Sequence, residues 1–139
     1  MRIPEEVVRF FERQNFVIVN TIDPDHGIHA AAKGIAVLDP GGEVFVADLY
    51  MRHTHQNLLQ DSRISLTAVD EKAFVGYCLQ GHAGIIPRKE IPAFLNEAWE
   101  KKIILRMSQR VMRGVQVQAR SEIHHEAHLP VQPQYVIKM

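Results

Sequence analysis

The segment that decides the fold spans residues 43–86 and reads EVFVADLYMRHTHQNLLQDSRISLTAVDEKAFVGYCLQGHAGII. An apolar strand ends at Asp48, a polar and cationic turn occupies residues 50–55, and a short helix follows at residues 56–60. Free backbone N–H groups at a helix start attract anions. A strand, a cationic turn and a helix start in succession therefore predict a site for a phosphate-sized anion beside a sheet.

Strands surround this segment on both sides. Turns rich in Asp, Pro and Gly at residues 23–27 and 39–42 join consecutive strands, and such short connections favour antiparallel pairing because parallel strands need long crossovers. The sequence predicts a mainly β fold, an antiparallel six- to seven-stranded barrel with peripheral helices. The predicted strands are residues 16–22, 28–38, 43–48, 64–69, 74–86, 111–120 and 135–139, and the predicted longer helices are residues 4–14 and 88–106.

The bulk composition is that of an ordinary globular domain, so we expect one domain over residues 1–139. Sixteen basic and sixteen acidic residues give no net charge, which disfavours a nucleic-acid surface. No secretory signal or membrane-spanning run is recognised. The single cysteine, Cys78, lies in an apolar strand and is expected to be buried. These features predict a cytoplasmic protein with no membrane partner.

The cationic turn supplies the candidate anion ligands. Arg52 offers a planar fork of donors, Thr54 is placed to cap the helix, and Asn57 adds an amide one turn later. His53 and His55 add further donors. The alternative is a solvated turn with a capping threonine. Neither glycine-rich phosphate-loop pattern occurs in the chain.

Two further polar interruptions of apolar strands are candidates for contact with a planar ligand. Lys33 lies among small residues, and Gly34 permits close backbone approach. Gln80 carries both a donor and an acceptor, which suit a heterocycle edge or a hydroxyl chain. The alternatives are an outward-facing lysine and an exposed face of an edge strand.

The densest histidine group does not predict a metal site. Its spacing differs from the His-Glu-x-x-His pattern and its segment has no helical periodicity. We expect a polar, solvated loop there. The group consists of His124, His125, Glu126 and His128.

The order of these motifs resembles the flavin site of the pyridoxamine 5′-phosphate oxidase-like split barrels, and most closely their small FMN-binding proteins. The similarity covers residues 5–120 and includes residues 50–58, 61–67 and 76–83. It implies a split β-barrel and a homodimer with FMN at the subunit interface. By this resemblance Arg52, Thr54 and Asn57 hold the phosphate, with His53 at a position that is often basic. Lys33 and Gly34 lie by the flavin ring or phosphate, Val46, Ala47 and Asp48 line the isoalloxazine, and Gln80 contacts the flavin side of the barrel.

The resemblance implies a flavin-dependent oxidoreductase or electron carrier with a small-molecule electron donor or acceptor, in which no protein residue need act as acid or base. The carboxy-terminal extension of the true oxidases has no recognisable counterpart, so pyridoxamine phosphate oxidation is not expected. The alternatives are a non-catalytic flavin-binding or sensing module, the same fold binding F420 or haem, and a barrel that has lost its cofactor.

Overall fold

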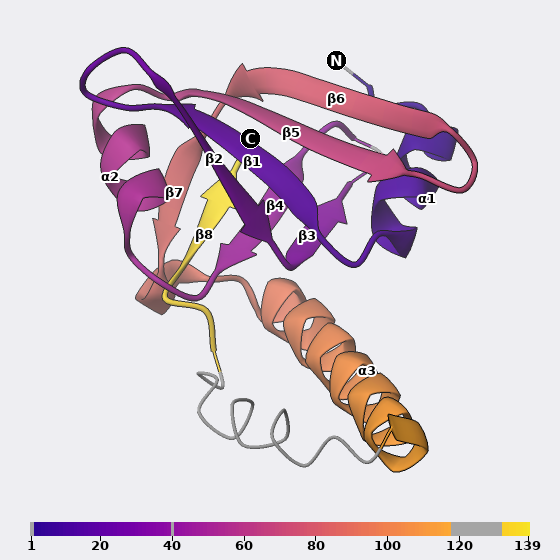
Figure 1. Ribbon diagram of the computed structural model, residues 1–139. Coiled ribbons are helices and arrows are strands. Elements are labelled where there is room, and N and C mark those ends of the chain that lie inside the picture. The colour runs from indigo at the N-terminus through magenta and orange to yellow at the C-terminus, as the bar shows by residue number, and fades with distance from the viewer. Residues whose placement is uncertain (1, 40, 118–131) are drawn as a thin grey trace.

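The structure, a computed structural model, describes residues 2–39, 41–117 and 132–139 (Figure 1). Its described part contains eight strands and three α-helices, with one 3₁₀ turn at Arg88–Glu90. The strands are β1 (Val17–Ile22), β2 (Ile28–Lys33), β3 (Ile35–Leu38), β4 (Val44–Asp48), β5 (Arg63–Asp70), β6 (Val75–His82), β7 (Gly84–Pro87) and β8 (Tyr135–Lys138). The helices are α1 (Glu5–Arg13), α2 (His53–Gln60) and α3 (Ala93–Val117).

The strands form two four-stranded antiparallel sheets. The first sheet has the order β2-β1-β5-β6 and the second has the order β3-β4-β8-β7. The two sheets pack face to face without closing into one continuous barrel. The mainly β, antiparallel split-barrel prediction is confirmed, although the described residues contain one strand more than the upper limit expected.

Two predicted long strands each divide in two where the chain passes from one sheet to the other, and helix replaces strand at residues 111–117, so the described part has one strand more than predicted. The predicted strand at 28–38 breaks at Gly34 into β2 and β3, and the one at 74–86 breaks at Ala83 into β6 and β7. A Cβ at Gly34 would collide with the guanidinium of Arg106 from α3. Glycine at this position therefore lets the Arg106 side chain approach the strand closely.

The core lies between the inner faces of the two sheets. Val19, Val46, Leu66 and Ile137 are fully buried there, since side chains alternate between the two faces of each strand. The helix α1 adds a buried stripe of Val7, Val8, Phe10 and Phe11 and packs against β3. In the view of Figure 1, α1 and α2 lie on opposite sides of the barrel.

The helix α3 corrects one sequence prediction. Residues 111–117 are helical, not the start of a strand. The preference of alternating valines for a strand is outweighed here by helix propagation, because each residue added to an existing helix gains a backbone hydrogen bond. The helix begins later than predicted, after Pro92, whose carbonyl accepts from Leu95 and Asn96 N–H groups. Its far end projects away from the barrel (Figure 1).

The outer face of the first sheet corrects a second prediction. Cys78 is exposed there and not buried, because Tyr77 and Leu79 occupy the inward positions of β6. An apolar strand in a sheet with one open face still directs every second residue outward. Among the described residues, no helix is long and apolar enough to cross a membrane.

Candidate functional site

Part of the predicted site lies at the seam, the place where β2 at the edge of the first sheet lies beside the end of β4 in the second. Three half-buried side chains of β2 face it, namely His29, Ala31 and Lys33, while the intervening residues of β2 are exposed. Asp48 faces it from β4. The helix α2 packs on β1 and β2 next to the seam.

Lys33 and Asp48 form an ion pair across the seam. Lys33 Nζ donates to Asp48 Oδ2 at 2.7 Å, and the two side chains are 14% and 3% exposed. The hydroxyl of the buried Tyr135 on β8 donates to the same carboxylate oxygen. The carboxylate is thus charge-compensated and hydrogen-bonded, as a buried anion must be. Lys33 is neither outward-facing nor unpaired.

Burial raises the pKa of Tyr135 well above its ordinary value, and the hydrogen bond to the Asp48 carboxylate and its negative charge raise it further. The phenol therefore remains a donor over the whole physiological range. Since Tyr135 belongs to β8, which pairs with β4, this donor fixes the orientation of the Asp48 carboxylate. The sequence alone did not single out Tyr135, because it lies 87 positions from Asp48.

The helix α2 begins at His53, with Arg52 as the residue before its first turn and no side chain capping it. The prediction that Thr54 caps the helix is wrong, because the chain enters the helix earlier and Thr54 is buried within the first turn. Arg52 and His53 are exposed. The guanidinium of Arg52 lies over the ring of Tyr50, 5.0 Å from its centroid, and forms no ion pair with a described residue. It is available to an anion at the helix start.

Asn57 is turned inward. Its amide Nδ2 donates to Thr21 Oγ1 of β1 at 3.0 Å, and both residues are 2% exposed. The bond anchors α2 to the first sheet, and it uses the amide that the sequence assigned to a phosphate. A similar restriction holds for Val46, whose side chain lies in the core, so that only its backbone and the half-buried Ala47 are available to a ligand.

Gln80 lies apart from the seam. It occupies the exposed outer face of β6, and β5 and β1 separate β6 from β2 in the first sheet. Three strand spacings amount to about 14 Å. Gln80 instead lines a separate hollow of about 450 Å³ on that sheet, together with Asn20, Arg63, Ser65 and His82. Within one protomer, Gln80 and Lys33 are therefore not adjacent.

His29 is a site residue that the sequence analysis missed. Its ring centroid lies 5.5 Å from that of His53, with the two planes tilted by 45°. Its Nδ1 atom is buried and has no hydrogen-bond partner among the described residues. The alternation of β2 was the available signal, since it places His29 and Lys33 on one face. The predicted histidine loop at 124–128 lies outside the described residues, and the described ones contain no group of three metal ligands.

Comparison with known proteins assigns the family. A model described as pyridoxamine 5′-phosphate oxidase matches residues 3–121. The chain belongs to this family. No curated protein matches it significantly.

Solved structures share the fold of this pyridoxamine 5′-phosphate oxidase family member at low sequence identity. HupZ from Group A Streptococcus has a TM-score of 0.65 at 18% identity, over 99% of this chain and 87% of that one. HutZ, the haem storage protein of Vibrio cholerae, has a TM-score of 0.53 at 15% identity, over 99% and 88%. An FMN-binding protein from Syntrophomonas wolfei has a TM-score of 0.55 at 9% identity, over 96% and 85%.

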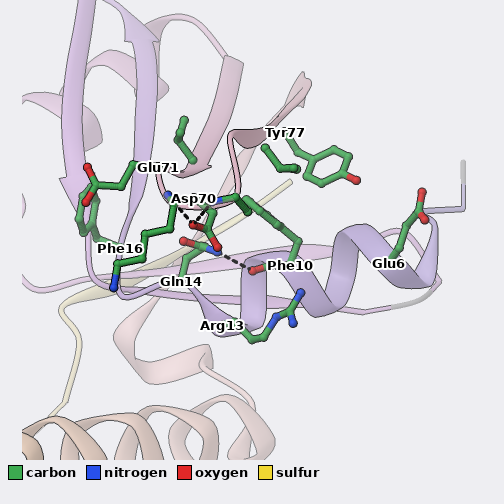
Figure 2. A pocket seen from close by; sticks show the side chains of 12 residues that line it. Glu6, Phe10, Arg13, Gln14, Phe16, Asp70, Glu71 and Tyr77 are labelled. Carbon is green, nitrogen blue, oxygen red and sulfur yellow. Dashed lines mark hydrogen bonds between the residues drawn. The ribbon is translucent and has the colours of Figure 1, made fainter.

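A second large hollow in this family member lies between α1 and the turn that joins β5 to β6 (Figure 2). It has a volume of about 920 Å³ and an aromatic floor, in which Phe10 and Tyr77 meet edge to face with centroids 4.9 Å apart. Its polar groups serve the local structure. Gln14 donates to the Phe10 carbonyl, and the Asp70 carboxylate accepts from the Lys72 and Ala73 N–H groups.

The donors at the seam could hold a phosphate group. Arg52 and His53 are exposed at a helix start, and His29 holds a nitrogen without a partner among the described residues. Anions favour such a position because the helix dipole and the free N–H groups act together. Lys33 lies at the same seam, with its charge balanced by Asp48.

Proposed function

We propose that the chain is a cytoplasmic, homodimeric FMN-binding protein that acts as a flavin-dependent oxidoreductase or electron carrier. The observation that carries the proposal is Arg52, which stands exposed at the start of α2, directly after β4, with no ion-pair partner among the described residues. An arginine fork in that position suits a phosphate group. The family match and the FMN-binding structural neighbour support FMN as the molecule that carries this phosphate group.

The residues of the chain bind and orient the cofactor in this proposal. Arg52 and His53 hold the phosphate, with the first N–H groups of α2 directed toward it. Lys33, held by Asp48, presents its ammonium along the seam, where it stabilises negative charge on the ligand. Bound FMN would supply the electron-transfer chemistry itself. The flavin ring would then be lined by Gly34, by Ala47 and by the backbone of Val46.

A second copy of the chain completes the site in this proposal. The outer face of the first sheet is open, with Ile28 80% exposed and Val69 64% exposed, and small residues such as Ala30 and Ala32 leave it flat. Open apolar faces of this kind mark interaction surfaces. Gln80 lies on this face, so that dimerisation through it would direct Gln80 toward the other protomer and not toward its own seam.

Binding of FMN to purified, ligand-free protein tests the proposal. We expect Arg52→Ala to weaken FMN about 10- to 100-fold, since a hydrogen bond to a charged group contributes about 1.5–3 kcal/mol. Riboflavin, which lacks the phosphate, should bind both proteins equally. Arg9→Ala is the control, because Arg9 is exposed on α1 and pairs with Glu5. A protein that takes up no FMN would refute the proposal.

Two alternatives have distinct outcomes. Mass spectrometry of a ligand retained on purification separates FMN from F420 and from haem, the ligand named for the structural neighbour HutZ. Turnover with a reduced nicotinamide and varied acceptors separates an oxidoreductase from a sensing module. An FMN-loaded protein without such turnover would be a flavin-binding or sensing module.

A further inference from the structure

The turn between β5 and β6 carries an aromatic side chain that the protomer leaves uncovered. Phe74 is 97% exposed, the most exposed of the large apolar residues in the described part of the chain. Its φ is 55°, a left-handed backbone conformation that is unfavourable for a bulky side chain. The exposed ring and the backbone conformation both cost free energy, which indicates a compensating contact outside the protomer.

A hollow that suits such a ring lies next to the same turn. The hollow between α1 and the turn has a volume of about 920 Å³ and a floor of Phe10 and Tyr77 (Figure 2). Ala73 and Val75, the neighbours of Phe74 in the sequence, line this hollow, whereas Phe74 itself does not. Phe74 therefore stands beside an aromatic hollow without filling it.

We propose that the hollow receives Phe74 of a second copy of the chain, in a two-fold contact separate from the cofactor site. Because the protruding ring and the hollow belong to one surface, a two-fold axis between two copies places each Phe74 in the hollow of the other. The inserted ring meets Phe10 and Tyr77, and aromatic pairs of this kind attract one another beyond their area of contact. The inference goes beyond the proposed function, since no residue that lines the hollow is assigned to the cofactor.

The charges around the hollow suit contact with an identical surface. Four charged side chains that line it form no ion pair with a described residue, namely Glu6, Arg13, Glu71 and Lys72. The helix α1 and the turn each carry one charge of each sign. Two-fold pairing brings the turn of one copy to α1 of the other, so Arg13 can face Glu71 and Glu6 can face Lys72. Such complementary charges favour a second copy over a partner surface of a single sign.

The size of the contact predicts weak and reversible association. Two inserted rings bury about 300–500 Å² and the hollows that receive them a similar area, which places the interface below about 1,200 Å² in total. Phe16 and Val75, which are 58% and 39% exposed at the margin of the hollow, add apolar surface. We therefore expect association that depends on protein concentration.

Phe74→Asn removes the ring without a threat to the fold. Asparagine tolerates the left-handed backbone better than phenylalanine does, so the melting temperature of the variant should equal or exceed that of the wild type at a protein concentration too low for association. In sedimentation equilibrium, the wild type should reach twice the mass of Phe74→Asn, and the variant should associate about 30-fold more weakly or worse, as expected for loss of a central interface residue. The control is Leu59→Gln, because Leu59 is 68% exposed on α2, on the other side of the barrel.

Charge exchange tests whether the occupant is a second copy. Arg13→Glu should weaken association, because it places two acidic side chains together, and Arg13→Glu/Glu71→Arg should restore it. Equal masses of the wild type and Phe74→Asn at all concentrations, or a double variant no tighter than Arg13→Glu, would overturn the inference. So would a wild type that stays at the mass of Phe74→Asn but binds the aromatic probe anilinonaphthalene sulfonate in a manner that Phe16→Ser abolishes, since the hollow would then hold a small ligand.

The mass of Phe74→Asn separates this inference from the proposed function. A dimeric variant retains the homodimer proposed for the outer face of the first sheet. A monomeric variant lacks that homodimer, while a wild type of twice its mass still supports the contact through the hollow. FMN uptake by Phe74→Asn should equal that of the wild type, and a loss of uptake in this variant alone would contradict the separation of the hollow from the cofactor site and overturn the inference.

Discussion

The Lys33–Asp48 ion pair provides a quantitative test of how the seam is held together. Lys33→Met leaves the Asp48 carboxylate, 3% exposed, with the Tyr135 hydroxyl as its remaining side-chain donor. Removal of one partner from a buried ion pair costs about 3–5 kcal/mol. Because Lys33 retains 14% exposure and Tyr135 still donates, we expect a loss of about 2–4 kcal/mol in the free energy of unfolding.

A double-mutant cycle isolates the pair itself. Asp48→Asn leaves the Lys33 ammonium without its anion, and the double variant Lys33→Met/Asp48→Asn leaves neither charge. The double variant should therefore lose about 1–3 kcal/mol less than the sum of the single losses. Denaturation with urea, followed by the fluorescence of the buried Trp99, the single tryptophan of the chain, measures each term.

An exposed ion pair in the same molecule is the matched control. Lys138 Nζ lies 2.6 Å from Glu43 Oε1, but the two side chains are 46% and 51% exposed. Lys138→Met should cost less than about 1 kcal/mol, because water and salt screen such a pair. If Lys33→Met costs no more than Lys138→Met, or if the cycle is additive, then the buried pair does not stabilise the seam and the reasoning fails.

Two further predictions concern the groups that support the site. Burial and the Asp48 carboxylate raise the pKa of Tyr135 above that of the unfolded chain. Its contribution to the free energy of unfolding is therefore present below about pH 10 and is lost as the pH rises above that value. In urea denaturation between pH 8 and pH 11, Tyr135→Phe should lose less stability than the wild type, and an equal alkaline loss in both proteins would contradict the assignment. Thr21→Val leaves the Asn57 amide without its buried acceptor and should lower the free energy of unfolding by about 1–3 kcal/mol. Thermal unfolding measures this loss, with Thr67→Val at a half-buried position as the control. A similar loss in the control would show that the Thr21–Asn57 hydrogen bond does not account for the effect.

Local sequence patterns predicted the hairpins and the order of strand, turn and helix at residues 43–60, although the helix begins at His53 and not at Gln56. Turn residues act through neighbouring backbone dihedrals, and alternation acts through the pleat, so both signals lie within a few positions. The same patterns failed where an interaction from outside the segment decided the outcome. Residues 111–117 alternate like a strand yet extend α3, and the breaks at Gly34 and Ala83 depend on a second sheet that no local pattern reports.

In the candidate site too, some features follow from local sequence and others depend on tertiary contacts. The exposed Arg52 and His53 at a helix start follow from the sequence, because a turn rich in polar side chains before a helix is a local feature. Their companions depend on tertiary structure. Tyr135 meets Asp48 across 87 positions, Asn57 turns inward because Thr21 lies beneath it, and Gln80 is excluded because two strands intervene.

The sequence by itself therefore determined the fold class and the polar, cationic turn before α2, since periodicity and turn chemistry are properties of adjacent residues. Only the tertiary structure decided which side chains that turn meets. The pairing of β2 with β1 and the packing of β4 beside it bring His29, Lys33 and Asp48 to one seam. Contacts between residues distant in sequence depend on the packing of the whole chain, so no single segment encodes them.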